Sequence, residues 1–315
     1  MPITIADIEL AAARIARYAH LTPIMRASSL DELAGCELQF KCENFQRVGA
    51  FKFRGACNAV WALEESVAKR GVVTHSSGNH GAALALAART RGIPAHVVVP
   101  EGAVATKVAA IERYGASVHR CAPTLAARDA MAAQIERDTG ATLIHPYTDE
   151  RVIAGQGTAA VELIRTLKTL DVLVAPIGGG GLIGGSAIAA RALLPQIHIF
   201  AAEPEGAAEA HASLQRGARV TDVVPDTVAD GLRATLGEIN FGLLREHAVQ
   251  TLLASDAEIV AAMRLIWERL KIVVEPSSAV TLAAVLRHRE HFAGKRVGVI
   301  LSGGNVDLDQ LPWCH

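Results

Sequence analysis

A lysine flanked by two phenylalanines has the clearest chemical potential in this sequence. Lys52 stands between Phe51 and Phe53, within ENFQRVGAFKFRGA at residues 43–56. A lysine side chain usually stays in water, where its amine is almost fully protonated and is not a nucleophile. Apolar neighbours disfavour the ammonium form and lower the pKa, so that the amine can attack an aldehyde. The alternative is that Lys52 extends into water from an amphipathic helix.

A run of glycines is the second candidate site. The run consists of Gly178, Gly179, Gly180 and Gly181, and Leu182 follows it. Backbone without side chains can bring its N–H groups close to a phosphate at the start of a helix. The alternative is a flexible turn. A reactive lysine together with a glycine-lined phosphate turn is most consistent with pyridoxal 5′-phosphate.

Two further turns of small polar residues follow apolar segments. The first, SSGNHG at residues 76–81, offers free backbone N–H groups at a helix start, which suit a carboxylate or phosphate. Its polar members are Ser76, Ser77, Asn79 and His80. The alternative is an ordinary helix cap. The second turn begins at Ser302 and is a weaker indication by itself.

The glycine run also permits a rival function. GGGLIG at residues 179–184 satisfies the G-x-G-x-x-G pattern of dinucleotide-binding proteins. Glu203 stands at the end of the next strand candidate, where a ribose-binding acid is expected. An NAD-dependent dehydrogenase is therefore an alternative, although it leaves Lys52 and the 76–81 turn unexplained.

The elements that position these residues alternate between short β-branched runs and long Ala- and Leu-rich stretches. Strands are predicted at residues 37–42, 72–75, 95–99, 117–121, 142–145, 171–177, 197–203 and 296–302. Such alternation predicts an α/β fold with parallel sheets covered by helices on both faces. Ligands bind such sheets beyond the carboxyl ends of the strands, which is where all three turns lie.

Composition excludes several classes of protein. The chain has 315 residues, a net charge of −1 and no long run of one charge, so no nucleic-acid partner or membrane surface is expected. The first 20 residues lack the basic start and apolar run of a signal peptide. The cysteines show no C-x-x-C spacing, which is typical of reduced thiols in a cytoplasmic protein. They are Cys36, Cys42, Cys57, Cys121 and Cys314.

Six ordered motifs together resemble one enzyme family. They are GAFKFRGA, SSGNHG, GGGGLI, TVADGL, WERLKIVVEPSSA and LSGGNVDL. The chain resembles the fold-type II pyridoxal-phosphate enzymes, and within them the serine/threonine dehydratases, serine racemases and hydroxyaspartate dehydratases. The resemblance implies a tryptophan synthase β-like fold of two doubly wound domains with mainly parallel sheets. Residues 1–70 and 149–315 would form the large domain and 71–148 the small one, in a homodimer.

The resemblance also implies roles for individual residues. Lys52 would bond to the cofactor aldehyde and then remove the substrate Cα proton, with Phe51 beside the ring. The residues expected to contact the cofactor are Asn79 at the phenolic oxygen, Gly178 to Gly181 and Leu182 at the phosphate, Ser302 at the pyridine nitrogen, and Gly231 and Glu275 along the ring. A hydroxyl at Ser302 does not keep that nitrogen protonated, which would soften the electron sink and suit elimination.

Further implied roles concern the substrate and a metal. Ser76, Ser77, Asn79 and His80 would receive the substrate carboxylate, and Ser77 would be the acid/base on the opposite face in a racemase. Glu203, the carbonyl of Ala207, and Glu209 match a divalent-cation site of the family, suited to Mg²⁺ or Ca²⁺. The family usually has aspartate where Glu209 stands, and two solvated surface carboxylates are the alternative.

The implied reaction is β-elimination of water from a β-hydroxy amino acid, which yields a 2-oxo acid and ammonia. L-Threonine or L-serine is the default substrate, and 3-hydroxyaspartate is favoured by Arg128, which matches an arginine that meets a second carboxylate. Arg128 could equally be a solvated helix charge. Tyr147 stands where some relatives have asparagine, which leaves the side-chain specificity open. Serine racemisation is an alternative, and a non-enzymatic amino-acid sensor is a more distant one.

Overall fold

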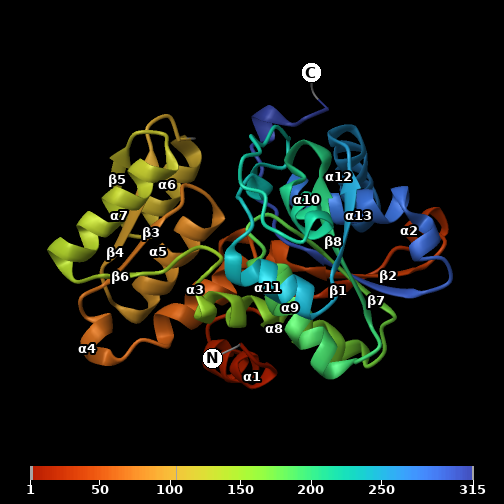
Figure 1. Ribbon diagram of the computed structural model, residues 1–315, viewed down its shortest axis with the longest axis horizontal. Coiled ribbons are helices and arrows are strands. Elements are labelled where there is room, and N and C mark those ends of the chain that lie inside the picture. Colours follow the sequence, from red (N-terminus) through yellow and green to blue (C-terminus); the bar gives the residue numbers. More distant parts are fainter. Residues whose placement is uncertain (1–2, 104, 314–315) are drawn as a thin grey trace.

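The computed structural model describes residues 3–103 and 105–313, and its chain forms two lobes side by side (Figure 1). The smaller lobe contains a parallel sheet in the order β5-β4-β3-β6. Its strands are β3 (Val72–His75), β4 (Ala95–Pro100), β5 (Ser117–Cys121) and β6 (Thr142–Leu143). Helices α5 (Asn79–Arg91) and α6 (Ala105–Arg113) pack on one face and α7 (Leu125–Thr139) on the other.

The larger lobe contains a sheet in the order β1-β2-β10-β7-β8-β9, in which only β1 is antiparallel to its neighbour. Its strands are β1 (Ile24–Met25), β2 (Glu37–Cys42), β7 (Val172–Pro176), β8 (His198–Pro204), β9 (Gln250–Ala254) and β10 (Arg296–Leu301). Strands β1 and β9 were not predicted, and β6 ends two residues before its predicted end. The α/β fold with parallel-dominated sheets is confirmed.

Helices cover both faces of the larger sheet. One face packs against α2 (Ser28–Ala34), α12 (Asp256–Leu270) and α13 (Pro276–Arg287). The other face packs against α1 (Ile5–Ile15), α8 (Glu150–Leu167), α9 (Gly181–Leu193), α10 (Glu209–Arg216) and α11 (Glu238–Glu246). Both faces of the inner parallel strands β2, β7, β8 and β10 are therefore buried, which explains why these strands read as continuous apolar runs.

Helix α3 (Lys52–Trp61) lies between the lobes and contacts both α5 and α8, while the short α4 (Glu65–Ala68) follows it (Figure 1). The approach of α3 to α8 is unusually close. A Cβ atom on Gly155 would lie 2.6 Å from the Cα of Gly55, so two glycines are needed where the helices cross. Because α3 packs on both lobes, the domain boundaries at residues 70 and 149 stay a prediction.

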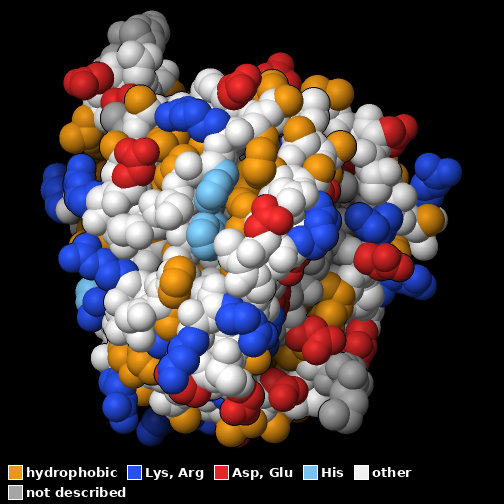
Figure 2. All heavy atoms as spheres, turned by 90° about the vertical axis from the view of Figure 1, so that its left-hand side faces the viewer, with side chains coloured by type: hydrophobic (Ala, Val, Ile, Leu, Met, Phe, Trp, Pro, Cys, Tyr) orange, Lys and Arg blue, Asp and Glu red, His pale blue; other side chains and the backbone are white. Residues whose placement is uncertain are grey.

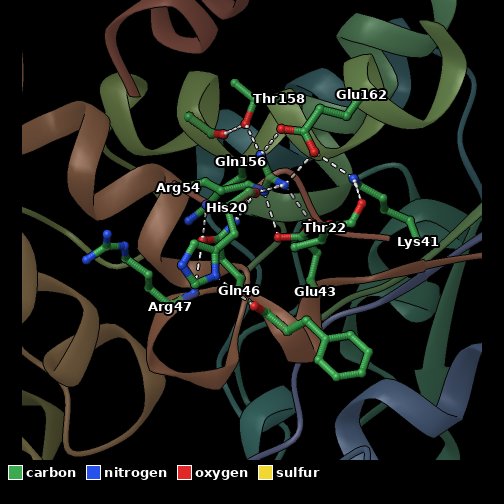
Figure 3. A network of polar contacts seen from close by, with 12 residues as sticks. His20, Thr22, Lys41, Glu43, Gln46, Arg47, Arg54, Gln156, Thr158 and Glu162 are labelled. Atoms are coloured by element: carbon green, nitrogen blue, oxygen red, sulfur yellow. Dashed lines mark hydrogen bonds and ion pairs between the residues drawn. The ribbon is translucent and has the colours of Figure 1, made fainter. Parts of the chain in front are cut away.

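A buried ionic network fixes the first turn of α3 (Figure 3). Arg54 has no exposed surface, and its guanidinium donates to both carboxylate oxygens of Glu43 at 2.6 and 2.8 Å. It also donates to both oxygens of Glu162 at 2.7 Å, and Lys41 donates to Glu162 at 2.6 Å. The network joins α3, β2 and α8 two residues after Lys52, so that the lysine backbone is held against the larger sheet.

One face of the surface carries charges of both signs, and the described cysteines are free. None of the described helices has the length and apolarity needed to cross a bilayer. On the face that the smaller lobe presents in Figure 2, Lys and Arg side chains are interspersed with Asp and Glu side chains. Cys36, Cys42, Cys57 and Cys121 are buried and unpaired, and Cys314 lies outside the described residues.

Candidate active site

Lys52 is the first residue of α3, and its amine lies between the two lobes. Its Nζ donates to the carbonyl oxygen of Pro146 at 2.9 Å and lies 5.1 Å from the ring centroid of Phe51. Burial lowers the pKa of Lys52 to about 8, although the nearby Glu275 carboxylate raises this pKa and offsets part of the shift. Phe53 points into the core and has no exposed surface. Phe51 therefore lies beside a desolvated amine, and Lys52 does not extend into water.

The glycine run forms the turn from β7 to α9, next to residue 147. Gly180 has a φ of 90°, which favours glycine. A Cβ atom on Gly179 would lie 2.3 Å from Cγ of Tyr147, so the tyrosine ring lies directly on the turn. Within the described residues, the N–H groups of residues 178–182 have no protein acceptor. Buried N–H groups without partners at a helix start form a binding site for an anion.

The tyrosine backbone is joined to the same turn. Asn240 donates through Nδ2 to the carbonyl oxygens of Gly179 at 2.6 Å and of Tyr147 at 2.8 Å. Because Lys52 donates to Pro146, one residue earlier, the segment 146–147 brings the lysine and the glycine turn to a common site. Asn240, which lies far along the chain in α11, was not predicted as a site residue.

The amino-terminal end of α13 supplies three polar side chains to this site. Glu275 lies against Gly303, since a Cβ atom on this glycine would be 2.6 Å from Oε1 of Glu275. Ser277 accepts a hydrogen bond from Gly231 N at 3.0 Å. Ser278 contacts the buried hydroxyl of Ser302. The motifs around Gly231, Glu275 and Ser302 are therefore adjacent, whereas Ser277 and Ser278 were not predicted as site residues.

Residue 79 links the lobes in this structure. Asn79 Nδ2 donates to the Glu275 carboxylate oxygens at 3.0 and 3.2 Å, and its Oδ1 accepts from Asn305 at 2.9 Å. Burial raises the pKa of Glu275 to about 7, and the negative charge of Asp230 also raises it. Asn79 therefore stands beside Glu275, one of the residues expected to line the cofactor ring.

The 76–81 turn begins α5 on the smaller lobe. The N–H groups of residues 79–81 have no protein acceptor among the described residues, and Ser76 and Ser77 are partly exposed. The His80 ring is buried, and its Nε2 lies 3.4 Å from the Ile144 carbonyl oxygen, which can only accept. The N–H of the His80 ring therefore donates to Ile144, and the backbone N–H of His80 is the group available to a carboxylate.

Aromatic side chains continue from Tyr147 towards α7. The His145 ring packs edge-on against the rings of Tyr147 and His75, with centroids 4.5 and 5.1 Å apart. His145 Nδ1 accepts from the N–H groups of residues 147 and 148, so its proton is on Nε2. Burial lowers the pKa of His145 to about 4, which keeps this ring neutral.

Arg128 lies in the first turn of α7, on the same side. Burial lowers the pKa of His75, and the positive charge of Arg128 lowers it further. The carboxylate of Asp129, 3.6 Å from the ring, raises this pKa and so offsets part of the shift. Arg128 also acts electrostatically on Tyr147, whose pKa is raised by burial and lowered in part by Arg128. Arg128 is thus a half-buried cation near the aromatic side chains and does not extend freely into solvent.

The predicted metal ligands lie on the larger lobe. Glu203 is the penultimate residue of β8 and accepts from the N–H groups of Ala210 and His211 at 2.8 Å. Glu209 accepts from Leu236 N at 3.0 Å. Both carboxylates are buried, as is Ala207, so the solvated alternative is wrong. Burial raises the pKa of both carboxylates. The negative charge of Glu209 raises the pKa of Glu203 further, to about 8. No described cluster of three His, Cys, Asp or Glu side chains could hold a metal.

The residues of the site fit pyridoxal phosphate. Unpaired N–H groups suit a phosphate, the desolvated Lys52 amine suits an aldehyde, and the Ser302 hydroxyl is available to a ring nitrogen. A dinucleotide at residues 179–184 would leave the lysine without a role.

Comparison with known proteins agrees with this chemistry. Residues 15–303 match the family model of pyridoxal-phosphate dependent enzymes. The chain is 50% identical over 310 residues to the β-hydroxyaspartate dehydratase of Paracoccus denitrificans, with 98% of each chain covered. It is 45% identical to the L-threo-3-hydroxyaspartate ammonia-lyase of Saccharomyces cerevisiae, covering 97% of this chain and 94% of that protein.

A solved structure shows the same fold. The serine racemase of Dictyostelium discoideum matches with a TM-score of 0.94 and 48% identity, covering 97% of this chain and 99% of that chain. The match covers nearly the whole chain, and it leaves no support for the dehydrogenase alternative. The chain therefore belongs to the family of pyridoxal-phosphate-dependent enzymes.

Proposed function

We propose that the protein is a pyridoxal-phosphate-dependent dehydratase that eliminates water from 3-hydroxyaspartate and releases a 2-oxo acid and ammonia. The observation that carries the substrate assignment is the position of Arg128 near His75 and Tyr147. Arg128 belongs to the smaller lobe, whereas the helix that begins at Lys52 also contacts α8 of the larger lobe. A cation and the neutral Nε2–H of His145 on one side of the site suit a second carboxylate. Two hydroxyaspartate enzymes among the relatives support the same substrate.

The protein residues divide the work between binding and proton transfer. The free N–H groups of the 76–81 turn bind the α-carboxylate, and those of residues 178–182 bind the cofactor phosphate. When bound, the cofactor supplies an aldehyde that bonds the substrate amino group and a ring that accepts electron density from Cα. Lys52 Nζ removes the Cα proton, since its pKa of about 8 leaves a fraction of free amine at neutral pH.

The overall reaction balances without an oxidant or a reductant. The Cα proton and the β-hydroxyl leave as water, and a second water then hydrolyses the resulting C=N bond to a 2-oxo dicarboxylic acid and ammonia. Asn79 is proposed to contact the cofactor phenolic oxygen, Phe51 to pack beside the ring, Ser302 to face the ring nitrogen, and Gly231 and Glu275 to line the ring.

Substrate preference is tested by comparing Arg128→Gln with wild type on 3-hydroxyaspartate and on L-serine. Loss of one charge-assisted hydrogen bond is expected to lower kcat/KM on hydroxyaspartate by about 10- to 100-fold. The value on L-serine should change by less than about threefold, because serine has no second carboxylate. Arg137→Gln, an exposed charge on the same helix, is the matched control. Equal losses on both substrates would contradict the assignment.

Serine racemisation is the second candidate activity. Ser77 carries a partly exposed hydroxyl in the turn that begins α5, on the smaller lobe, and serine racemases occur among the relatives. A Ser77 hydroxyl on the substrate face opposite Lys52 could return a proton to Cα. Formation of D-serine from L-serine, lost in Ser77→Ala while oxo acid release persists, would support this activity.

We also propose that Glu203, the Ala207 carbonyl and Glu209 bind a divalent cation, Mg²⁺ or Ca²⁺. The support is two buried carboxylates whose pKa values are raised to about 8 and about 7, because a cation would relieve their desolvation. A homodimer and a cytoplasmic location likewise remain predictions from the sequence.

A further inference from the structure

Two buried serine hydroxyls lie in hydrogen-bond contact at the carboxyl end of β10. Ser278 Oγ, on α13, is 3.1 Å from Ser302 Oγ, and the two residues are 0% and 2% exposed. Solvent does not reach this contact, so each hydroxyl proton must be directed to an acceptor of the protein or of a bound ligand.

The partners of Ser278 determine which serine donates. Ser278 Oγ lies 2.6 Å from the carbonyl oxygen of Gly303, which can only accept, and 2.7 Å from Gly303 N, which can only donate. A hydroxyl has one proton and two lone pairs. The Ser278 proton is therefore used on Gly303, and its second lone pair faces Ser302. In this contact Ser302 must be the donor.

The other protein acceptor near Ser302 is much weaker. The carbonyl oxygen of Ser277 lies 3.5 Å from Ser302 Oγ, at the limit of a hydrogen bond. With its proton turned towards Ser278, Ser302 offers lone pairs to any group that approaches from the site. A protonated ring nitrogen can donate to such a lone pair, whereas an unprotonated one needs the Ser302 proton for itself.

We propose that Ser278 is a positioning residue that favours the protonated ring nitrogen of the cofactor by competing for the Ser302 proton. This inference rests on the proposed contact of Ser302 with that nitrogen. A hydroxyl at Ser302 was expected to soften the electron sink. Ser278 opposes that softening, so the ring withdraws electrons from the substrate Cα more strongly than Ser302 alone would allow.

The test uses holoenzyme reconstituted with ring-¹⁵N pyridoxal phosphate, and it measures the ¹⁵N chemical shift of the ring nitrogen at one pH. Ser278→Ala frees the Ser302 proton, so the shift should move towards the unprotonated ring. A net hydrogen bond between neutral groups corresponds to about a two- to tenfold change in the ratio of protonated to unprotonated nitrogen. Thr281→Val is the matched control, because Thr281 donates to the Ser278 carbonyl oxygen at 2.7 Å and, among the described residues, has no hydrogen bond to the Ser302 hydroxyl. It should leave the shift unchanged.

A second variant covers a failure of folding. Ser278→Ala leaves Gly303 N unpaired, whereas Ser278→Cys keeps a weakly accepting sulfur and should give an intermediate shift in the same direction. An unchanged shift in whichever variant folds, or a shift towards the protonated ring, overturns the proposal. An unchanged shift in Ser302→Ala overturns its premise. None of these measurements uses turnover, so absence of dehydratase activity would refute the proposed function and leave this result standing.

Discussion

Replacing Arg54 by methionine would test whether the buried ionic network holds the α3 helix start. Arg54 has no exposed surface and donates five hydrogen bonds to Glu43, Glu162 and Thr158. Glu43 is fully buried, whereas the Glu162 side chain is 23% exposed and can regain water. Removing one partner of a buried ion pair costs about 3–5 kcal/mol, because the other charge stays desolvated. At about 2–4 °C per kcal/mol, the melting temperature should fall by about 6–20 °C.

The pH dependence of this loss is a sharper test than its size. Burial alone would raise the pKa of Glu43, but the charge of Arg54 and its hydrogen bonds outweigh burial and hold the pKa below its ordinary value. A lowered folded-state pKa gives stability that is present above the unfolded pKa and is lost as pH falls. Without Arg54 burial dominates and the Glu43 pKa rises, so the variant gains relative stability as pH falls. The difference in unfolding free energy should therefore be largest near pH 7 and shrink towards pH 4.

Urea unfolding of the apoprotein at several pH values measures this difference directly. The matched variant is Arg54→Met with Glu43→Gln, which removes the stranded charge and should be more stable than Arg54→Met alone. A loss below about 1 kcal/mol at pH 7 would be the size of an exposed pair. That result, or a loss independent of pH, would refute the argument that Glu43 is desolvated and held ionised by Arg54.

Three other predictions follow from the site. Gly179→Ala places a methyl group against the Tyr147 ring and should weaken pyridoxal phosphate binding to the apoprotein at least tenfold. Adding Tyr147→Ala should restore part of the affinity. Fluorescence titration measures both affinities, and a Gly179→Ala affinity equal to that of wild type would be contrary evidence. The rate of cofactor attachment should rise with pH with a midpoint near 8, because the free Lys52 amine reacts, whereas a midpoint near 10.5 would show an ordinary lysine. A chelator should lower the melting temperature of wild type but not of Glu203→Gln with Glu209→Gln, and no effect on wild type would argue against the cation.

The sequence predicted the main elements because parallel strands buried on both faces leave a strong apolar signal. Residues 72–75 and 37–42 begin and end where predicted. Strands β1 and β9 were missed because both are edge strands, β1 has two residues, and neither carries a run of β-branched residues. These strands are set by tertiary pairing more than by local preference.

The site was predictable to the extent that its residues lie in recognisable turns. Lys52, the glycine run, the 76–81 turn and Ser302 come together, since all follow or adjoin carboxyl ends of strands. Ser278, Asn240 and His145 were missed because their roles depend on contacts with residues far away in the chain. The orientation of the Ser302 hydroxyl depends on Gly303 and Ser278 together, and no local pattern encodes it.

The proposed function requires that the Lys52 amine bonds to the cofactor aldehyde. Borohydride reduction of the holoenzyme makes that bond permanent, and digestion followed by mass spectrometry locates the pyridoxyl group. We expect the label on the peptide that contains Lys52, in a yellow protein whose visible absorbance is bleached by the reduction. A label on another lysine, such as Lys41 or Lys107, or no label on a protein that binds the cofactor, would contradict the account.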